Sequence, residues 1–366
     1  MVQEFEAAHD ARLQWECERL PVSNHQRCAF ECVDPHFSGQ WVVAVPSSPA
    51  LYISGELLPI ISARYLGVVD QTCAGRVGQD IAGKKLNPGN RASPLARLDP
   101  HGDTLFSVHL GDSMRDRHDA IKQAVMQLAK WAGLACDLEV YGLFKDAIPQ
   151  VARTRLQQRG KRDRQGLVPD FRFSGKIQGL AELKTIGRCP TYYHLPGSNP
   201  PGHRQWGRKP VDHRALSIQG EYEAKLRRID SPNGRLVTRL HSFGQVQGFV
   251  VGAYGELSRD FVGFVHAVVE TKLGSEAKFQ RAGASYLYTH VRRQLGVAAV
   301  CAFATQHSRS LCYCGPGGKA LYDARRQAKQ RSYRYSADLQ AQWYCDFHKT
   351  NASLHGTGAR AMFGKW

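Results

Sequence analysis

The pattern of hydrophobic and polar positions between residues 113 and 254 predicts helices that alternate with strands. The first helix is predicted over 114–132, with Ser113 placed to cap its first turn and Gly133 placed to end its last. The apolar face of this helix consists of Ile121, Val125, Leu128, Ala129 and Trp131. A short strand is predicted to follow over residues 136–144.

Two short apolar runs, 166–173 and 179–186, have the residue types of β-strands and are separated by a polar turn around Gly175. A helix is predicted over 217–229, and the nearly continuous apolar run 246–254 suits a central buried strand. The order is helix, strand, strand, strand, helix, strand, and its last three elements form a β-α-β crossover. We predict an α/β fold in which a small mixed β-sheet is flanked by helices, with helical extensions at both ends.

The flanking segments have weaker patterns. The predicted elements are a polar helix leading into a Cys/His stretch within 1–40, a strand or extended piece at 40–46, a helix at 54–66, a strand or part of a helix at 261–269 and a long helix at 286–303. These patterns divide the chain into an N-terminal helical and extended region at 1–69, an irregular linker at 70–112, a core with basic insertions at 113–305 and a Cys-, Arg- and Tyr-rich tail at 306–366.

The charge of the chain indicates the class of its partner. The 366 residues carry a formal net charge of +17, and residues 151–240 hold 19 Lys and Arg against 7 Asp and Glu. A globular chain this basic usually binds a polyanion, so we expect a nucleic acid, DNA first and RNA second. The residues expected to follow its phosphates are Arg153, Arg155, Arg159, Lys161, Arg162 and Arg164.

The sequence lacks the marks of a membrane or secreted protein. We find no run of about 18 or more apolar residues, and the first residues lack the basic and apolar regions of a signal peptide. The ten cysteines do not follow the pattern of a small disulfide-rich domain. An intracellular, reduced protein without membrane contact is expected, and a DNA partner favours the nucleus.

Three residues in the two apolar runs carry the most specific chemistry. Asp170 lies in the first run, and Glu182 and Lys184 lie in the second, two positions apart and therefore on one face of a strand. If the runs pair as a hairpin, two carboxylates and an ammonium converge. Such a site suits a hard cation such as Mg²⁺ or Mn²⁺ with a water beside it, the chemistry of phosphodiester cleavage. The alternative is a solvated face or a surface ion pair.

Pro169-Asp170 and Glu182-Leu183-Lys184, on adjacent strands in this order of elements, resemble the motif of the PD-(D/E)XK nuclease superfamily. The resemblance implies a restriction-endonuclease-like core. It implies that Asp170, Glu182 and the carbonyl of Leu183 ligate the metal. It further implies that Lys184 polarises the attacking water.

A second resemblance covers most of the chain, which is similar to the endonuclease-like C-terminal region of polyproteins from non-LTR-type retroelements. The similar segments are 38–51, 117–121, 248–255 and 291–298. In those polyproteins a Cys/His knuckle precedes the nuclease domain. Here Cys73 and the run 99–103 take its place, with Thr104 and Val108 nearby and the further cysteines absent. A decayed knuckle that binds no zinc is expected, within the 70–112 linker.

Accessory roles remain open between catalysis and ordinary packing. The residues concerned are Glu139, Asp119, His118, Tyr222 and Lys225. Glu139 and Asp119 are alternative sources of a further carboxylate, and for Asp119 a solvated helical face is an equal interpretation. His118 is a candidate proton shuttle or phosphate contact against a structural role. Tyr222 and Lys225 share a helix face that either reaches the scissile phosphate or is an amphipathic surface.

Two groups of cysteines and histidines are candidate zinc ligands. The first is His25, Cys28, Cys32 and His36, and the second is Cys312, Cys314, Cys345 and His348. Their spacings only partly match the usual pairs of zinc ligands, so zinc is a doubtful cofactor here.

The sequence leaves three functions open. The first is a metal-dependent DNA endonuclease of retroelement origin. The second is a catalytically inactive nucleic-acid-binding module with a nuclease-like fold, and the third is a structural or assembly protein with a fortuitous motif. The target site and the oligomeric state do not follow from the sequence.

Overall fold

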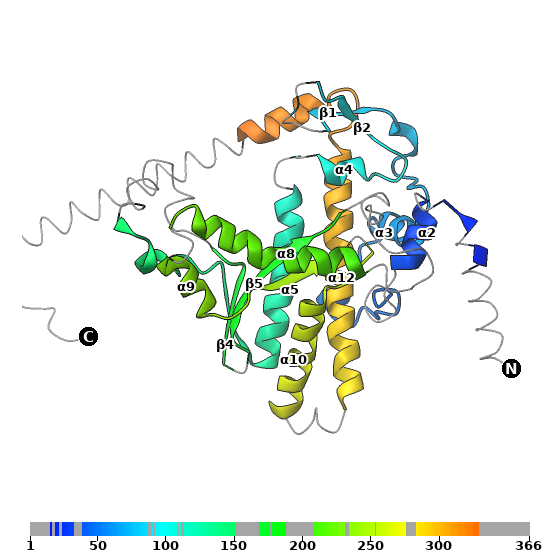
Figure 1. Ribbon diagram of the computed structural model, residues 1–366. Helices are drawn as coiled ribbons and strands as arrows, with labels where there is room; N and C mark the ends of the chain where they lie inside the picture. The colour runs from blue at the N-terminus through cyan, green and yellow to red at the C-terminus, as the bar shows by residue number, and fades with distance from the viewer. Residues whose placement is uncertain are drawn as a thin grey trace, which may run out of the picture.

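The structure is a computed structural model of the 366-residue chain. It describes residues 15–16, 19–21, 24–32, 39–86, 90, 92–108, 110, 113–150, 152, 168–175, 177–187, 208–230, 234–252, 254–275 and 283–328. The fold is α/β, as predicted: a mixed four-stranded sheet packs against helices, and a separate two-stranded sheet lies apart from it (Figure 1).

The main sheet consists of β3 (Ala135–Leu138), β4 (Phe171–Ser174), β5 (Gly179–Thr185) and β6 (Gln247–Val251), in that spatial order. The pairs β3–β4 and β4–β5 are antiparallel, whereas β5 and β6 are parallel. The parallel pair is joined through α8 (Arg208–Arg227) and α9 (Arg235–His241). The predicted hairpin and the predicted β-α-β crossover are therefore both confirmed.

Helices cover the two faces of the sheet unequally (Figure 1). On one face lie α5 (Ser113–Ala132), α10 (Arg259–Ser275) and α12 (Ala284–Leu311), which also pack against one another. On the other face lie α8 and α9. The alternation of side chains along β5 explains the arrangement: Ala181 and Leu183 enter the core under α5 and α10, while Leu180 enters the core under α8.

The small sheet lies beyond the C-terminal end of α12 (Figure 1). It consists of β1 (Asp80–Lys85) and β2 (Leu95–Arg97), preceded by a 3₁₀ turn (Ala74–Arg76) and followed by α4 (Thr104–Ser107). Ile81 forms an antiparallel bridge with Cys314, which follows α12, and the two residues share a small buried cluster with Cys73. The stretch 70–112 was expected to be an irregular linker. Within its described residues it instead forms this sheet, over a small core completed by Tyr313 and Cys314.

The N-terminal part of the described chain packs along α12. Its elements are α2 (His25–Cys32), a 3₁₀ turn (Pro49–Leu51) and α3 (Leu58–Leu66). Ile60 and Ile61 of α3 contact Val297 and Ala304 of α12 in one buried cluster. The remaining short elements are a 3₁₀ turn (Lys145–Ala147) and a helical segment at 318–328.

Several predicted elements were wrong in detail. The strand predicted over 136–144 ends at Leu138, because Glu139 adopts a positive φ of 46° that breaks the extended backbone. Residues 39–43 form turns rather than a strand. The run 261–269, predicted as a strand or part of a helix, belongs to helix α10, so the second alternative is confirmed.

The strand at 246–254 was predicted to be central, but β6 is the last strand in the order of the main sheet. It is nevertheless buried, because the chain turns back along its outer side. Leu257 forms a bridge with Val251, and the backbone N–H of Ser258 donates to the carbonyl of Val250 at 3.0 Å. Because this edge is covered, β6 can be continuously apolar. An exposed apolar edge strand could instead pair with another chain and aggregate.

Candidate active site

Asp170, Glu182 and Lys184 meet where β4 begins and β5 ends. The antiparallel register pairs Phe171 with Ala181, so continuing it by one residue places Asp170 opposite Glu182. The backbone N–H of Leu183 donates to Oδ2 of Asp170 at 2.9 Å. Leu183 lies between Glu182 and Lys184 in β5, so this bond holds the Asp170 carboxylate against the backbone that carries both residues. The predicted hairpin thus places Asp170 and Glu182 opposite each other by register.

Glu182 is held from two sides. The ammonium of Lys184 donates to its Oε1, and the phenol of Tyr222 on α8 donates to its Oε2 at 2.6 Å. Tyr222 is buried, and burial together with the charges of Glu182 and Asp170 raises its pKa well above the ordinary value. Tyr222 therefore stays a hydrogen-bond donor. The Lys225 ammonium lies 5.6 Å from the centre of the Tyr222 ring.

Helix α5 contributes His118 to the same site. The His118 Nε2 lies 3.1 Å from Oδ2 of Asp170, and its Nδ1 lies 3.3 Å from Oδ1 of Asp119. Burial lowers the pKa of His118, but the hydrogen bond and charge of Asp170 outweigh burial and leave the pKa raised. In the same way, burial raises the pKa of Asp170, and His118 more than offsets this, so the pKa is lowered. The pair favours a histidinium beside a carboxylate.

Lys122, one turn after His118, is a site residue that the sequence analysis missed. Its side chain is only 4% exposed, and its Nζ lies 2.6 Å from Glu139, 3.3 Å from Asp119 and 3.7 Å from Asp170. Burial lowers its pKa, but these carboxylates outweigh that effect and raise it. A signal existed in the sequence, because Lys122 lies at helical spacing between His118 and the apolar Val125.

Replacing Lys122 with methionine should destabilise the chain. Methionine keeps the length of the side chain but leaves the Asp170 carboxylate, which is 12% exposed, without its ammonium. Loss of one partner of a buried ion pair costs about 3 kcal/mol. Two of the three pairs of Lys122 are weaker, because Asp119 and Glu139 are more than a third exposed. We therefore expect the free energy of unfolding to fall by about 3 kcal/mol or less. Urea denaturation followed by circular dichroism measures the change.

Lys130→Met is the matched control, because Lys130 lies on the exposed side of the same helix. Its denaturation midpoint should stay within error of the parent. Equal midpoints for Lys122→Met and the parent would show that the Lys122 ion pairs add nothing to stability.

Several predicted site residues lie outside the described part of the chain. These are the basic residues Arg153, Arg155, Arg159, Lys161, Arg162 and Arg164, the zinc candidates Cys345 and His348, and His36. Of the second zinc set, Cys312 is exposed and Cys314 is buried. Of the first set, Cys28 is buried in the core under α8, and His25 stacks on His101 and pairs with Asp103 at 2.7 Å. The side chain of Cys32 is not described.

One compact group of candidate metal ligands stands out among the described residues, and it is not the predicted one. Asp70, Cys73 and His307 are all buried, and their ligand atoms lie within 4.8 Å of one another. The predicted ligands Asp170 and Glu182 belong to no such group of three His, Cys, Asp or Glu side chains within the described residues. Their neighbours are instead the cations of His118, Lys122 and Lys184.

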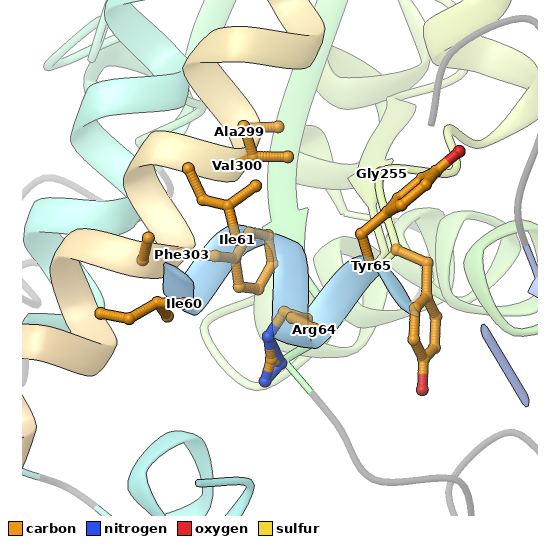
Figure 2. Close-up of a pocket in the computed structure, with 10 residues that line it drawn as sticks. Ile60, Ile61, Arg64, Tyr65, Gly255, Ala299, Val300 and Phe303 are labelled. Atoms are coloured by element: carbon orange, nitrogen blue, oxygen red, sulfur yellow. The ribbon is translucent and has the colours of Figure 1, made fainter. Parts of the chain in front are cut away.

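A pocket away from these residues lies between α3 and α12 (Figure 2). Its lining is mostly apolar, with Ile61 and Val300 facing each other across it. The one charged side chain in the lining, Arg64, lies 4.1 Å from the Phe106 ring centre and pairs with Asp103 at 3.5 Å. Since its cation is already engaged, the pocket is best explained as an imperfect fit between two packed helices.

No protein-family model matches the chain, and no curated protein or solved structure is similar to it at a significant level. None of the helices in the described part of the chain is both long and apolar enough to cross a bilayer. The function is therefore inferred from the site itself.

Proposed function

We propose that the chain is a metal-dependent endonuclease that hydrolyses phosphodiester bonds in DNA, derived from a retroelement and acting in the nucleus. The observation that supports this best is the meeting of Asp170, Glu182 and Lys184 at one end of the sheet, linked by the hydrogen bond from Leu183 N–H to Asp170. A basic chain with a net charge of +17 supplies the field that attracts a polyanion.

The donor atoms fit Mg²⁺ or Mn²⁺ by type. Carboxylate and backbone carbonyl oxygens are the ligands these hard cations prefer, and Asp170, Glu182 and the Leu183 carbonyl would supply them. When bound, the ion supplies Lewis acidity at a phosphoryl oxygen and an activated water. A bound cation would compete with His118 for Asp170 and with Lys184 for Glu182, because these side chains now pair with the two carboxylates.

The side chains around the carboxylates have distinct proposed roles. Lys184, 31% exposed, is the cation that would hold the attacking water and offset charge developing on the phosphate. Tyr222 orients Glu182 through its hydroxyl. His118 is placed to accept or release a proton beside Asp170.

The second candidate is a nucleic-acid-binding module that no longer cuts. One observation favours it: the oxygens of Asp170 and Glu182 already have partners within the chain, among them Leu183 N–H, His118, Lys184 and Tyr222. A polar network whose members are already paired rigidifies the fold, and it does so without a bound metal. Both candidates bind DNA, so cleavage itself separates them.

A cleavage assay on the full chain tests the proposal. Supercoiled plasmid is incubated with the protein and Mg²⁺, with a second sample containing a chelator and a third containing duplex RNA of matched length. We expect nicked and linear DNA only in the presence of the metal. DNA that is bound but stays intact with Mg²⁺ and with Mn²⁺ would favour the inactive module.

DNA binding should depend steeply on salt whether or not the chain cuts. Each phosphate that a lysine or arginine neutralises releases counterions. A variant in which glutamine replaces all four of Arg159, Lys161, Arg162 and Arg164 should therefore bind DNA with a weaker salt dependence. The slope of log affinity against log salt should flatten by about 0.9 per lost phosphate contact. Fluorescence anisotropy with a labelled duplex at several salt concentrations measures the slope. An unchanged slope would place the DNA path elsewhere.

A further inference from the structure

The buried group formed by Asp70, Cys73 and His307 lies far from Asp170 in the sequence and uses different elements. Asp70 and Cys73 flank a turn before β1, and His307 lies in the last turns of α12. The three residues are 3%, 0% and 1% exposed. The Nε2 of His307 lies 3.1 Å from Oδ2 of Asp70 and 3.6 Å from Sγ of Cys73.

The Asp70 carboxylate and the Cys73 thiol reach the same nitrogen of His307, which argues against a catalytic relay. A Cys-His-Asp relay needs the thiol on one ring nitrogen and the carboxylate on the other. Here both face Nε2, which can donate to only one of them. A single cation at the centre would serve all three ligand atoms at once.

Two of the three distances between these atoms are close to the edges of a tetrahedral zinc site, and all three lie within 4.8 Å. Zinc bond lengths of about 2.3 Å to sulfur, about 2.0 Å to nitrogen and about 2.1 Å to oxygen imply edges of about 3.5 Å for S···N and about 3.3 Å for N···O. The observed separations are 3.6 Å and 3.1 Å. The side chains therefore need only small shifts to bind such an ion.

Further contacts hold the ligands in place. The backbone N–H and the hydroxyl of Thr72 donate to Oδ1 of Asp70 at 2.8 Å and 2.7 Å, which leaves Oδ2 directed at His307. The His307 ring packs against Gly102, where a Cβ atom would lie 2.3 Å from Cε1. Partners that orient a ligand from behind are typical of built metal sites.

From this geometry we infer that Asp70, Cys73 and His307 form a structural Zn²⁺ site. Thiolate, imidazole and carboxylate together suit zinc, whereas Mg²⁺ and Ca²⁺ prefer oxygen alone. The three side chains leave one tetrahedral position for a water or a fourth ligand, and their burial keeps substrates away. The site would fasten the turn before β1 to α12, beneath a two-stranded sheet whose own core is small. It does not rest on the proposed nuclease activity.

Metal analysis of the purified full chain tests the site. We expect Cys73→Ser to carry one zinc per chain fewer than the parent. Cys301→Ser, which changes a partly buried cysteine of α12 that belongs to no candidate zinc set, should keep the parental content. With Co²⁺ in place of zinc, the parent should show a thiolate-to-cobalt charge-transfer band that Cys73→Ser lacks. A parent chain that takes up no zinc would overturn the site. So would equal zinc content and equal cobalt spectra in the parent and in Cys73→Ser.

Thr72→Val keeps the test decisive if Cys73→Ser does not fold. This nearly isosteric change removes the hydroxyl that donates to Asp70 and lies 3.5 Å from the Nε2 of His307, and it removes none of the ligands. We expect zinc affinity, measured by competition with a chromophoric chelator, to fall about 10- to 100-fold, as loss of such a partner does elsewhere. A folded Thr72→Val chain with parental zinc affinity would count against the site.

Discussion

Replacing Asp170 with asparagine or Glu182 with glutamine should abolish Mg²⁺-dependent cleavage and leave DNA binding intact. Each change removes one carboxylate charge with almost no change in volume, so the metal loses a charged ligand while the packing stays the same. Asparagine can still accept the hydrogen bond from Leu183 N–H, and glutamine can still accept the one from Tyr222. Plasmid nicking and anisotropy binding, measured on the same preparations, read the two effects separately.

Glu223→Gln is the matched control for Glu182→Gln. Glu223 lies one position after Tyr222 on α8, but its partners are Gln219, Arg227 and His241 rather than any site residue. The Glu223→Gln variant should cleave at the parental rate. Parental cleavage by Asp170→Asn or Glu182→Gln, with folding confirmed by circular dichroism, would remove these carboxylates from the reaction and leave the inactive binding module as the better account.

The central frame of the fold was predictable because its signals are local. The helical spacing of Ile121, Val125 and Leu128 and the Gly133 stop predict α5 from one stretch of sequence. The two apolar runs around Gly175 likewise predict a hairpin, and the hairpin alone brings Asp170 and Glu182 together. Both predictions need only short-range periodicity and turn chemistry.

The missed features depend on contacts between distant elements. The helical spacing of Lys122 places it on one face with His118, but it does not show which carboxylates lie opposite. Its meaning emerges only when Glu139, 17 residues away, turns back through its positive φ to meet it. The buried edge position of β6 depends on the turn that ends at Ser258. Periodicity reports which side of an element is apolar, not which neighbour covers it.

The Asp70–Cys73–His307 group likewise depends on a contact between elements that are far apart in the sequence. Cys73 and His307 are separated by 234 positions, and their spacing matches no familiar pair of zinc ligands. By resemblance, Cys73 and the run 99–103 were expected to form a decayed knuckle. In the structure that run does lie nearby, since Gly102 packs on the His307 ring. The partner of the cysteine, however, comes from α12.

Replacing Lys184 with alanine should lower the cleavage rate by about 10²-fold or more, because it removes a positioned cation that stabilises charge in the transition state. The Lys184 ammonium pairs with Oε1 of Glu182. Without it, Glu182 keeps the hydrogen bond from Tyr222 and loses a competing cation. Mg²⁺ affinity should therefore stay at the parental value or rise, while the rate falls.

Single-turnover cleavage and Mg²⁺ titration on the same chain separate these two effects. Lys319→Ala, at an exposed position on the helical segment 318–328, should change neither quantity. Metal binding that collapses in Lys184→Ala would mean that the ammonium orders Glu182 rather than serving the reaction. A slow enzyme with parental metal affinity is the outcome that separates a catalytic lysine from a structural one, because an ordering role would weaken the metal site together with the rate.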